Sequence, residues 1–192
     1  ADGDKNMARD AAVLATKQDF GGRMIAIRAN GFLSPHHADD IRAISDSDAD
    51  CIVLPKVEKA SDLDRAARLC SKPAIAMIET GAGLYAARDI AAHPAVIGLF
   101  AGTNDLAKEI GIDLNQGRAG LALALQMMVL AARTSGKAIF DGVNNNLDDM
   151  AALTEEGQEA RQFGFTGKTL IHPRQIEPAN QIFAATSEQI DD

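Results

Sequence analysis

Short, uninterrupted runs of apolar residues recur along the chain, separated by longer segments in which apolar residues fall at helical spacing. Such runs are typical of strands buried on both faces of a parallel sheet, because a half-exposed strand alternates apolar and polar residues. The pattern predicts strands at 24–27, 51–54, 74–78, 96–101, 138–140 and 169–171.

Helices are expected before, between and after these strands. Ser34 and Ser61 are suited to N-cap positions, and Gly136 to the C-cap of a long Ala/Leu helix. The expected helices cover 4–16, a segment begun by Ser34 and Pro35, 61–69, 84–92, 119–134, 147–163 and 178–184. Strands that alternate with helices predict an α/β fold, which we expect to form one domain over 1–192.

Polar residues gather where each predicted strand ends. A single one of them is explained by a helix cap or a turn, but active sites of α/β proteins also form at this edge. Their recurrence after all six strands favours an enzyme. The residues concerned are Arg28, Asn30, Lys56, Glu58, Glu79, Thr80, Thr103, Asn104, Asp105, Asp141 and His172.

Two of these residues, Glu79 and Asp105, are carboxylates that follow apolar strands without a basic neighbour in sequence. Mg²⁺ prefers oxygen ligands and usually keeps waters and substrate groups in its other positions, so the pair is a candidate Mg²⁺ site. The alternatives are an N-cap role for Asp105 and a structural ion pair for Glu79.

Arg28 ends its strand beside Asn30 and Gly31. Its guanidinium could hold a carboxylate or a developing enolate oxygen through paired N–H groups, or form a salt bridge with an acid at a neighbouring strand end. Lys56 and Glu58 could belong to the same layer of ion pairs.

Composition narrows the classes of protein. The 192 residues are 46% hydrophobic and carry a net charge of −8, which argues against disorder and against wrapping nucleic acid. There is no long apolar run and no visible secretory signal, so we expect a cytoplasmic protein without a membrane partner. Cys51 and Cys70 are expected to be buried thiols.

Other short motifs carry less chemistry. Residues 164–169 lack the first glycine of a phosphate-binding loop and precede a predicted strand. His36 and His37 lack a metal-ligand spacing and are expected at the surface, and Asn144–Asn146 is expected to be a loop.

Six motifs in order resemble the HpcH/HpaI aldolase and citrate lyase beta-subunit family, and most closely its citrate lyase beta-subunit-like branch, which includes malyl-CoA and citramalyl-CoA lyases. They cover essentially the whole chain. The motifs are Val53–Glu58, Met77–Thr80, Leu99–Leu106, Asp141–Val143, Gly164–Lys168 and Ile171–Ile176.

The resemblance implies a TIM (β/α)₈-type barrel that uses Mg²⁺ to make or break a carbon–carbon bond. It makes Glu79 and Asp105 the Mg²⁺ ligands and Arg28 the catalytic contact to the oxo acid and the reacting oxygens. It assigns positioning of the oxo acid to Gly102, Thr103 and Asn104, and pocket-shaping or thioester-carrier contacts to Pro55, Lys56 and His172.

The implied reaction cleaves a citryl, citramalyl or malyl thioester of CoA or acyl carrier protein into an acetyl or related thioester and a 2-oxo acid. A homotrimer or a dimer of trimers is implied as well. Two alternatives remain: a pyruvate-type class II aldolase acting on a free hydroxy-oxo acid, and a non-catalytic subunit that binds metal and oxo acid.

Two features of the family have no counterpart in the sequence. Family members have two further strands before the first one predicted here, and an aspartate well beyond the Ile171–Ile176 motif that acts as a catalytic acid or base. We therefore expect these residues to be part of a longer barrel protein that retains the metal site, with turnover requiring the distal aspartate.

Overall fold

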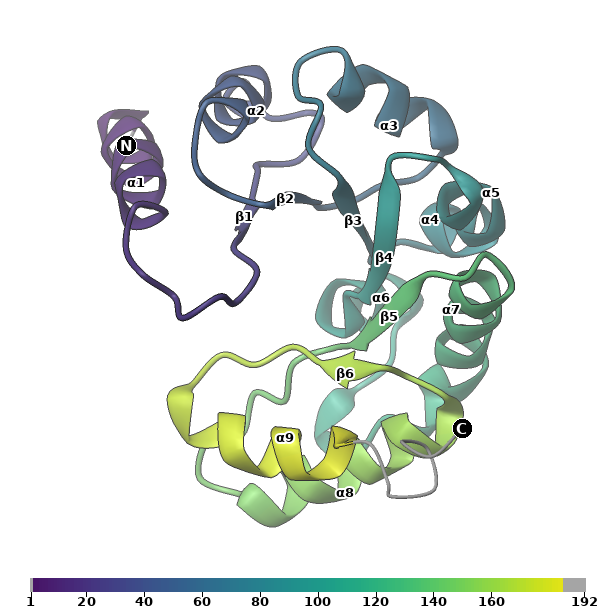
Figure 1. The fold of residues 1–192 in the computed structure, drawn as a ribbon. Helices are drawn as coiled ribbons and strands as arrows, with labels where there is room; N and C mark the ends of the chain where they lie inside the picture. The colour runs from purple at the N-terminus through teal and green to yellow at the C-terminus, as the bar shows by residue number, and fades with distance from the viewer. Residues whose placement is uncertain (1, 185–192) are drawn as a thin grey trace.

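A computed structural model describes residues 2–184. These residues form an α/β structure around a six-stranded sheet whose strands follow one another in sequence order, with parallel pairing throughout. The sheet curls, and most helices lie along its outer side (Figure 1). The strands are β1 (Ala26–Arg28), β2 (Cys51–Leu54), β3 (Ala74–Ile78), β4 (Val96–Ala101), β5 (Ala138–Asp141) and β6 (Gly167–Lys168).

Helices connect successive strands, as parallel pairing requires. In the part of the chain that the structure describes, no helix is long and apolar enough to cross a bilayer. The helices are α1 (Asp2–Ala15), α2 (His37–Ser45), α3 (Ala60–Ala67), α4 (Gly81–Tyr85), α5 (Ala87–Ala92), α6 (Thr103–Ile110), α7 (Ala122–Thr134), α8 (Met150–Phe163) and α9 (Ile176–Phe183), with 3₁₀ turns η1 (Leu114–Gln116), η2 (Ala119–Leu121) and η3 (Pro173–Gln175).

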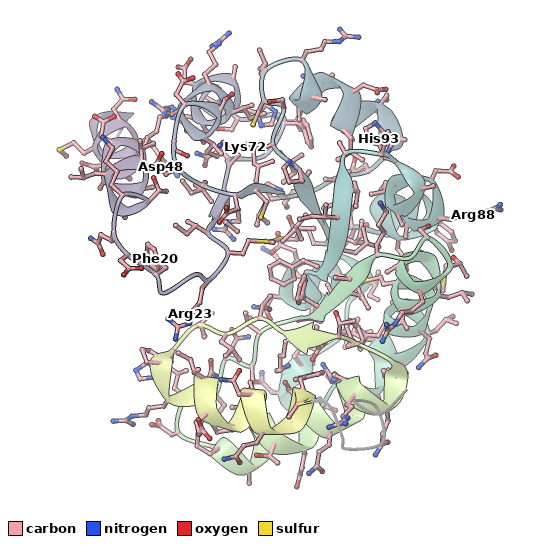
Figure 2. The ribbon with its side chains drawn as sticks, viewed as in Figure 1. Phe20, Arg23, Asp48, Lys72, Arg88 and His93 are labelled. Atoms are coloured by element: carbon pink, nitrogen blue, oxygen red, sulfur yellow. The ribbon has the colours of Figure 1, made fainter. Side chains whose placement is uncertain are left out.

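The hydrophobic core lies between the sheet and the outer helices. Leu99 on β4 is fully buried, and Ile90 on α5 and Met128 on α7 are equally buried and belong to the same cluster. The opposite side of α5 carries Arg88, whose side chain points away from the molecule (Figure 2). This division of apolar and polar faces fixes the helices on the sheet and leaves the strand ends for polar side chains.

The strands predicted at 51–54, 74–78 and 96–101 match β2, β3 and β4, but the last strand prediction was wrong. Strand β6 is Gly167–Lys168, earlier than the expected 169–171. The chain leaves the sheet here because the Ile171 N–H donates to the side chain of Gln175 at 3.0 Å, which caps η3. That N–H is therefore not available to the sheet.

Several helix predictions also need correction. Helix α6 was not expected at all, and the segment 84–92 is divided into α4 and α5 at Ala86. The N-cap residues are His36 for α2 and Lys59 for α3, not the expected serines. His37 is buried rather than at the surface, with Nδ1 2.7 Å from the Asn30 carbonyl oxygen.

Candidate functional site

The C-terminal ends of β1 to β4 meet at one cavity of about 410 Å³. These strands are neighbours in the sheet, so residues that follow them must lie side by side. Six of the residues singled out in the sequence line the cavity: Arg28, Asn30, Pro55, Lys56, Glu79 and Asp105. Helices α1 and α2 close its other side.

Glu79 directly follows β3 and is only 7% exposed. Its Oε1 accepts a hydrogen bond from the backbone N–H of Lys56 at 2.9 Å. Burial raises the pKa of Glu79, and the nearby charge of Asp105 raises it further, against opposing contributions from Lys56 and Arg28. A buried carboxylate beside a second carboxylate is stabilised by a cation.

Gly102 leaves room for this carboxylate. Its N–H donates to the carbonyl oxygen of Ile78 at 2.9 Å, which draws the turn after β4 against the end of β3. A Cβ atom on Gly102 would lie 2.3 Å from the Glu79 Cβ and 3.0 Å from its Oε2. The position therefore admits no side chain unless Glu79 moves.

Asp105 lies in the first turn of α6, two residues after the helix begins at Thr103. Its carboxylate is half exposed, and its Oδ2 is 3.0 Å from the Lys56 Nζ. The N-cap of α6 is Gly102, so the alternative N-cap role for Asp105 does not apply. Its side chain is free of helix capping and faces the cavity that Glu79 also lines.

Lys56 joins the two carboxylates. Its backbone N–H bonds to Glu79 and its ammonium pairs with Asp105. The hydrogen bond and the charge of Asp105 raise the pKa of Lys56, and the charges of Glu79 and Glu109 add to this effect. Among the described residues Lys56 alone combines a side chain with a left-handed backbone, at φ +51°.

The opposite wall of the cavity holds a network that the sequence did not predict. Asp40 accepts hydrogen bonds from the Asn30 backbone N–H at 2.9 Å, from the Asn30 side chain, and from the Arg9 Nε at 2.8 Å. Burial by itself raises the pKa of Asp40, but these bonds and the Arg9 charge together lower it below its usual value. Nothing in the sequence around Arg9 signals this pairing.

Thr103 and Asn104 lie away from this cavity. Thr103 is buried and contributes to a second cavity of about 410 Å³. Asn104 and Asn145 exchange side-chain hydrogen bonds, at 2.8 and 3.3 Å. The loop predicted at 144–146 is thereby tied to the start of α6, next to Asp105.

His172 also lies outside the residues that line the first cavity. Its Nδ1 accepts the N–H of Arg174 at 3.2 Å, so the side chain caps η3. The structure thus gives His172 a local structural role and does not bring it to Glu79 and Asp105.

A buried charge cluster follows β5 and β6. Asp141 is fully buried, accepts two hydrogen bonds of 2.9 Å from Arg118, and pairs with the Lys168 Nζ at 2.7 Å. Lys168 also contacts Glu156 on α8 at 3.1 Å. Lys168 belongs to the segment that resembled a phosphate loop, and its observed partner is a carboxylate of the protein itself.

The donor set of the first cavity suits Mg²⁺. Among residues 2–184 no group of three or more His, Cys, Asp or Glu side chains gathers as a metal cluster. A pair of carboxylates is nevertheless what Mg²⁺ commonly uses, since it retains waters and takes substrate oxygens as further ligands. Glu79 and Asp105, which repel each other across the same cavity, form such a pair.

Similar proteins in sequence include a (3S)-malyl-CoA thioesterase of Cereibacter sphaeroides, 42% identical over 174 residues. The citrate lyase subunit beta of Leuconostoc mesenteroides is 33% identical over 185 residues. Each match covers 90% of this chain and 61% of the relative. The chain thus spans about three fifths of the length of these relatives.

A similar solved structure is the citrate lyase beta subunit of M. tuberculosis complexed with oxaloacetate and magnesium. It has a TM-score of 0.84 and 27% identity, and the match covers 96% of this chain and 82% of that one. This similarity confirms the expected α/β fold of the TIM-barrel type, of which the described residues form a curled half-barrel. The model of the HpcH/HpaI aldolase/citrate lyase family matches residues 1–173, and the chain belongs to this family.

Proposed function

We propose that the protein is a Mg²⁺-dependent carbon–carbon lyase that cleaves a 3-hydroxy acyl thioester. The observation that carries the proposal is the convergence of Glu79, Asp105 and Arg28 on one cavity. The magnesium and oxaloacetate named for the M. tuberculosis structure support a metal and an oxo acid as ligands. The malyl-CoA named for the Cereibacter relative supports CoA as the thioester carrier.

Glu79 and Asp105 would hold the Mg²⁺. When bound, the metal supplies a Lewis acid for the hydroxyl and carboxylate oxygens of the substrate. Arg28, which lines the same cavity, presents paired N–H donors to the oxygen on which negative charge develops. Pro55 and Lys56 also line this cavity and contribute to its shape.

The cleavage is a retro-Claisen reaction. The substrate hydroxyl loses its proton, its oxygen forms the carbonyl of the 2-oxo acid, and the adjacent carbon–carbon bond breaks. The electron pair of that bond becomes the thioester enolate, which takes a proton at carbon to give the acetyl thioester. The Arg28 guanidinium stabilises the charge as it passes from the alkoxide to the enolate.

Gly102, Thr103 and Asn104 would act on the ligand Asp105 by forming the turn that leads to it. Gly102 admits the Glu79 carboxylate, Thr103 begins α6, and Asn104 ties the turn to Asn145. These three residues would therefore position the metal ligands, in addition to any contact that they make with the oxo acid.

The metal ligands are tested by replacing each carboxylate with its amide. Glu79→Gln and Asp105→Asn should each weaken Mg²⁺ binding roughly tenfold or more, because each removes one of the two carboxylates that would hold this hard cation. Isothermal calorimetry measures the affinity, with Glu58→Gln as a control, since Glu58 is exposed and outside the cavity lining. Unchanged affinity in both site variants would show that the metal binds elsewhere.

A second candidate function is hydrolysis of the thioester, which the name of the 42% identical relative favours. The two reactions differ in their products. With malyl-CoA, a lyase releases glyoxylate and leaves acetyl-CoA, whereas a thioesterase releases malate and free CoA thiol. Measuring oxo acid and free thiol in one assay, with and without EDTA, separates them.

The same assay addresses the alternatives from the sequence. Cleavage of a free hydroxy-oxo acid with no action on thioesters would indicate a pyruvate-type aldolase. A stoichiometric complex with an oxo acid and no turnover would indicate a binding subunit. Oxo-acid release from the thioester that persists after complete Mg²⁺ removal would contradict the proposed metal dependence.

A further inference from the structure

Lys56 contacts both candidate metal ligands, each through a different nitrogen atom. Its backbone N–H donates to the Glu79 Oε1 at 2.9 Å, and its Nζ lies 3.0 Å from the Asp105 Oδ2. The left-handed backbone at Lys56, φ +51°, is a conformation that residues with a side chain rarely adopt. It fixes the N–H toward Glu79 while the side chain extends to Asp105.

The two contacts differ in how easily they change. The backbone N–H belongs to a turn held between β2 and α3, and its hydrogen bond is with a buried carboxylate. The side chains of Lys56 and Asp105 are 55% and 47% exposed, so their ion pair is solvated and can open without disturbing the turn. Only the ammonium is therefore free to leave.

The Lys56 ammonium and a divalent cation would interact with Asp105 in the same way. Each is attracted by the same carboxylate, and each relieves the repulsion between Asp105 and Glu79. Two cations held at one carboxylate also repel each other. A metal ion that takes the Asp105 Oδ2 must therefore replace the Lys56 Nζ or share the oxygen with it at a cost.

We propose that Lys56 is an internal competitor of the divalent cation, and that its ammonium is displaced from Asp105 when the metal binds there. Lys56 thus lowers the affinity of the cavity for the metal, because its ammonium competes with any cation for the Asp105 carboxylate. The inference rests on the proposed function for the position of the metal, and it adds a residue that sets metal affinity without being a ligand.

The experiment compares Mg²⁺ affinity by isothermal calorimetry in the wild-type protein and in Lys56→Met. Methionine keeps a long unbranched side chain and faces the same backbone requirement, but it cannot pair with Asp105. The variant should bind Mg²⁺ about three- to tenfold more tightly, tenfold being about 1.4 kcal/mol. Lys56→Arg retains the charge and should remain close to wild type.

The matched control is Lys5→Met. Lys5 lines the same cavity, and its Nζ donates to the Asn30 Oδ1 at 3.2 Å rather than to a carboxylate. Lys5→Met therefore removes the same charge from the cavity without removing a contact to a metal ligand. The Mg²⁺ affinity of this variant should change much less than that of Lys56→Met. An equal gain in both variants would reduce the effect to general electrostatics and overturn the proposal.

The remaining outcomes are distinct. Wild-type protein that binds no Mg²⁺ overturns both the proposed function and this inference, whereas wild-type binding with no gain in Lys56→Met overturns the inference alone. Should Lys56→Met fail to fold, the Lys56 side-chain NMR signal of the wild-type protein, identified by its loss in Lys56→Arg, is followed during Mg²⁺ titration. A signal that moves with saturation supports release of the ammonium, and one that stays fixed overturns it.

Discussion

Gly102 illustrates how one missing side chain makes room for a functional one. Its φ of −83° is ordinary for any residue, so backbone freedom does not explain the glycine. The explanation is the approach of its backbone to Glu79, which a Cβ atom would block at 2.3 Å. The family resemblance implies a contact of Gly102 with the oxo acid, and the structure adds the close approach of its backbone to a candidate metal ligand.

Gly102→Ala should therefore displace Glu79 and weaken Mg²⁺ binding, with a loss of about 1–3 kcal/mol in the free energy of unfolding from overpacking. Calorimetry and urea denaturation measure the two effects. Gly31→Ala is the matched control, because Gly31 lines the same cavity and a Cβ atom there would meet nothing within 4 Å. Equal Mg²⁺ affinity in both variants would mean that Glu79 does not depend on this space.

At the scale of elements, Asp40 connects α2 to both α1 and the turn after β1. Arg9 reaches it from α1, and Asn30 reaches it from the turn through a backbone and a side-chain donor. Charge-assisted hydrogen bonds of this kind, at a carboxylate that is nearly buried, are among the stronger polar contacts in proteins. They hold α1 against the wall of the cavity.

These bonds make stability depend on pH. The pKa of Asp40 is lowered in the folded protein, so its stabilising contribution is present above the usual aspartate pKa of about 3.9 and is lost as the pH falls through the lower folded pKa. Asp40→Asn should reduce the free energy of unfolding by about 1.5–3 kcal/mol at pH 7 and by less at pH 3. Urea denaturation at both pH values measures the difference.

Asp39→Asn is the control for this experiment. Asp39 is the adjacent residue of α2 and forms an ion pair with Arg42. The Asp39 side chain is 63% exposed and the Arg42 side chain is 59% exposed. A solvated pair of this kind contributes about 0–1 kcal/mol, so the variant should behave almost as wild type at both pH values. A pH-independent loss in Asp40→Asn would contradict the assigned role of its charge.

The elements differ in how well the sequence predicted them, for physical reasons. Strands β2, β3 and β4 are continuous apolar runs with polar residues one or two positions after them. This contrast predicts both the strands and the neighbouring positions of Glu79 and Asp105. Helix α6 is hard to predict because its first residues, Thr103–Asp105, are of types common in turns and metal sites, and because it offers only a short apolar face. The Arg9–Asp40 pair depends on tertiary packing alone, which no local pattern encodes.

At the scale of the whole molecule, the cluster around Asp141 ties together parts of the chain that are far apart in sequence. Asp141 ends β5, Lys168 ends β6, and Arg118 comes from the segment before α7 and also contacts Glu159 on α8. The side chains of Asp141 and Lys168 are almost completely buried. Each charge therefore depends on the others for compensation.

Asp141→Asn should lower the free energy of unfolding by about 3–5 kcal/mol, because it leaves Lys168 and Arg118 buried with less negative charge. Asp148→Asn, an exposed position in the loop that follows β5, should change it by no more than about 0.5 kcal/mol. Chemical denaturation measures both. Equal stability of the two variants would show that the cluster is not needed to hold β5 and β6 together.

The sequential order of the strands has a consequence for folding during synthesis. Each strand pairs with the next one along the chain, and every residue that lines the cavity precedes α7. A chain synthesised from its N-terminus presents its earlier segments for folding first. The cavity can therefore begin to assemble on the ribosome, before β5, β6 and the Asp141 cluster have been translated.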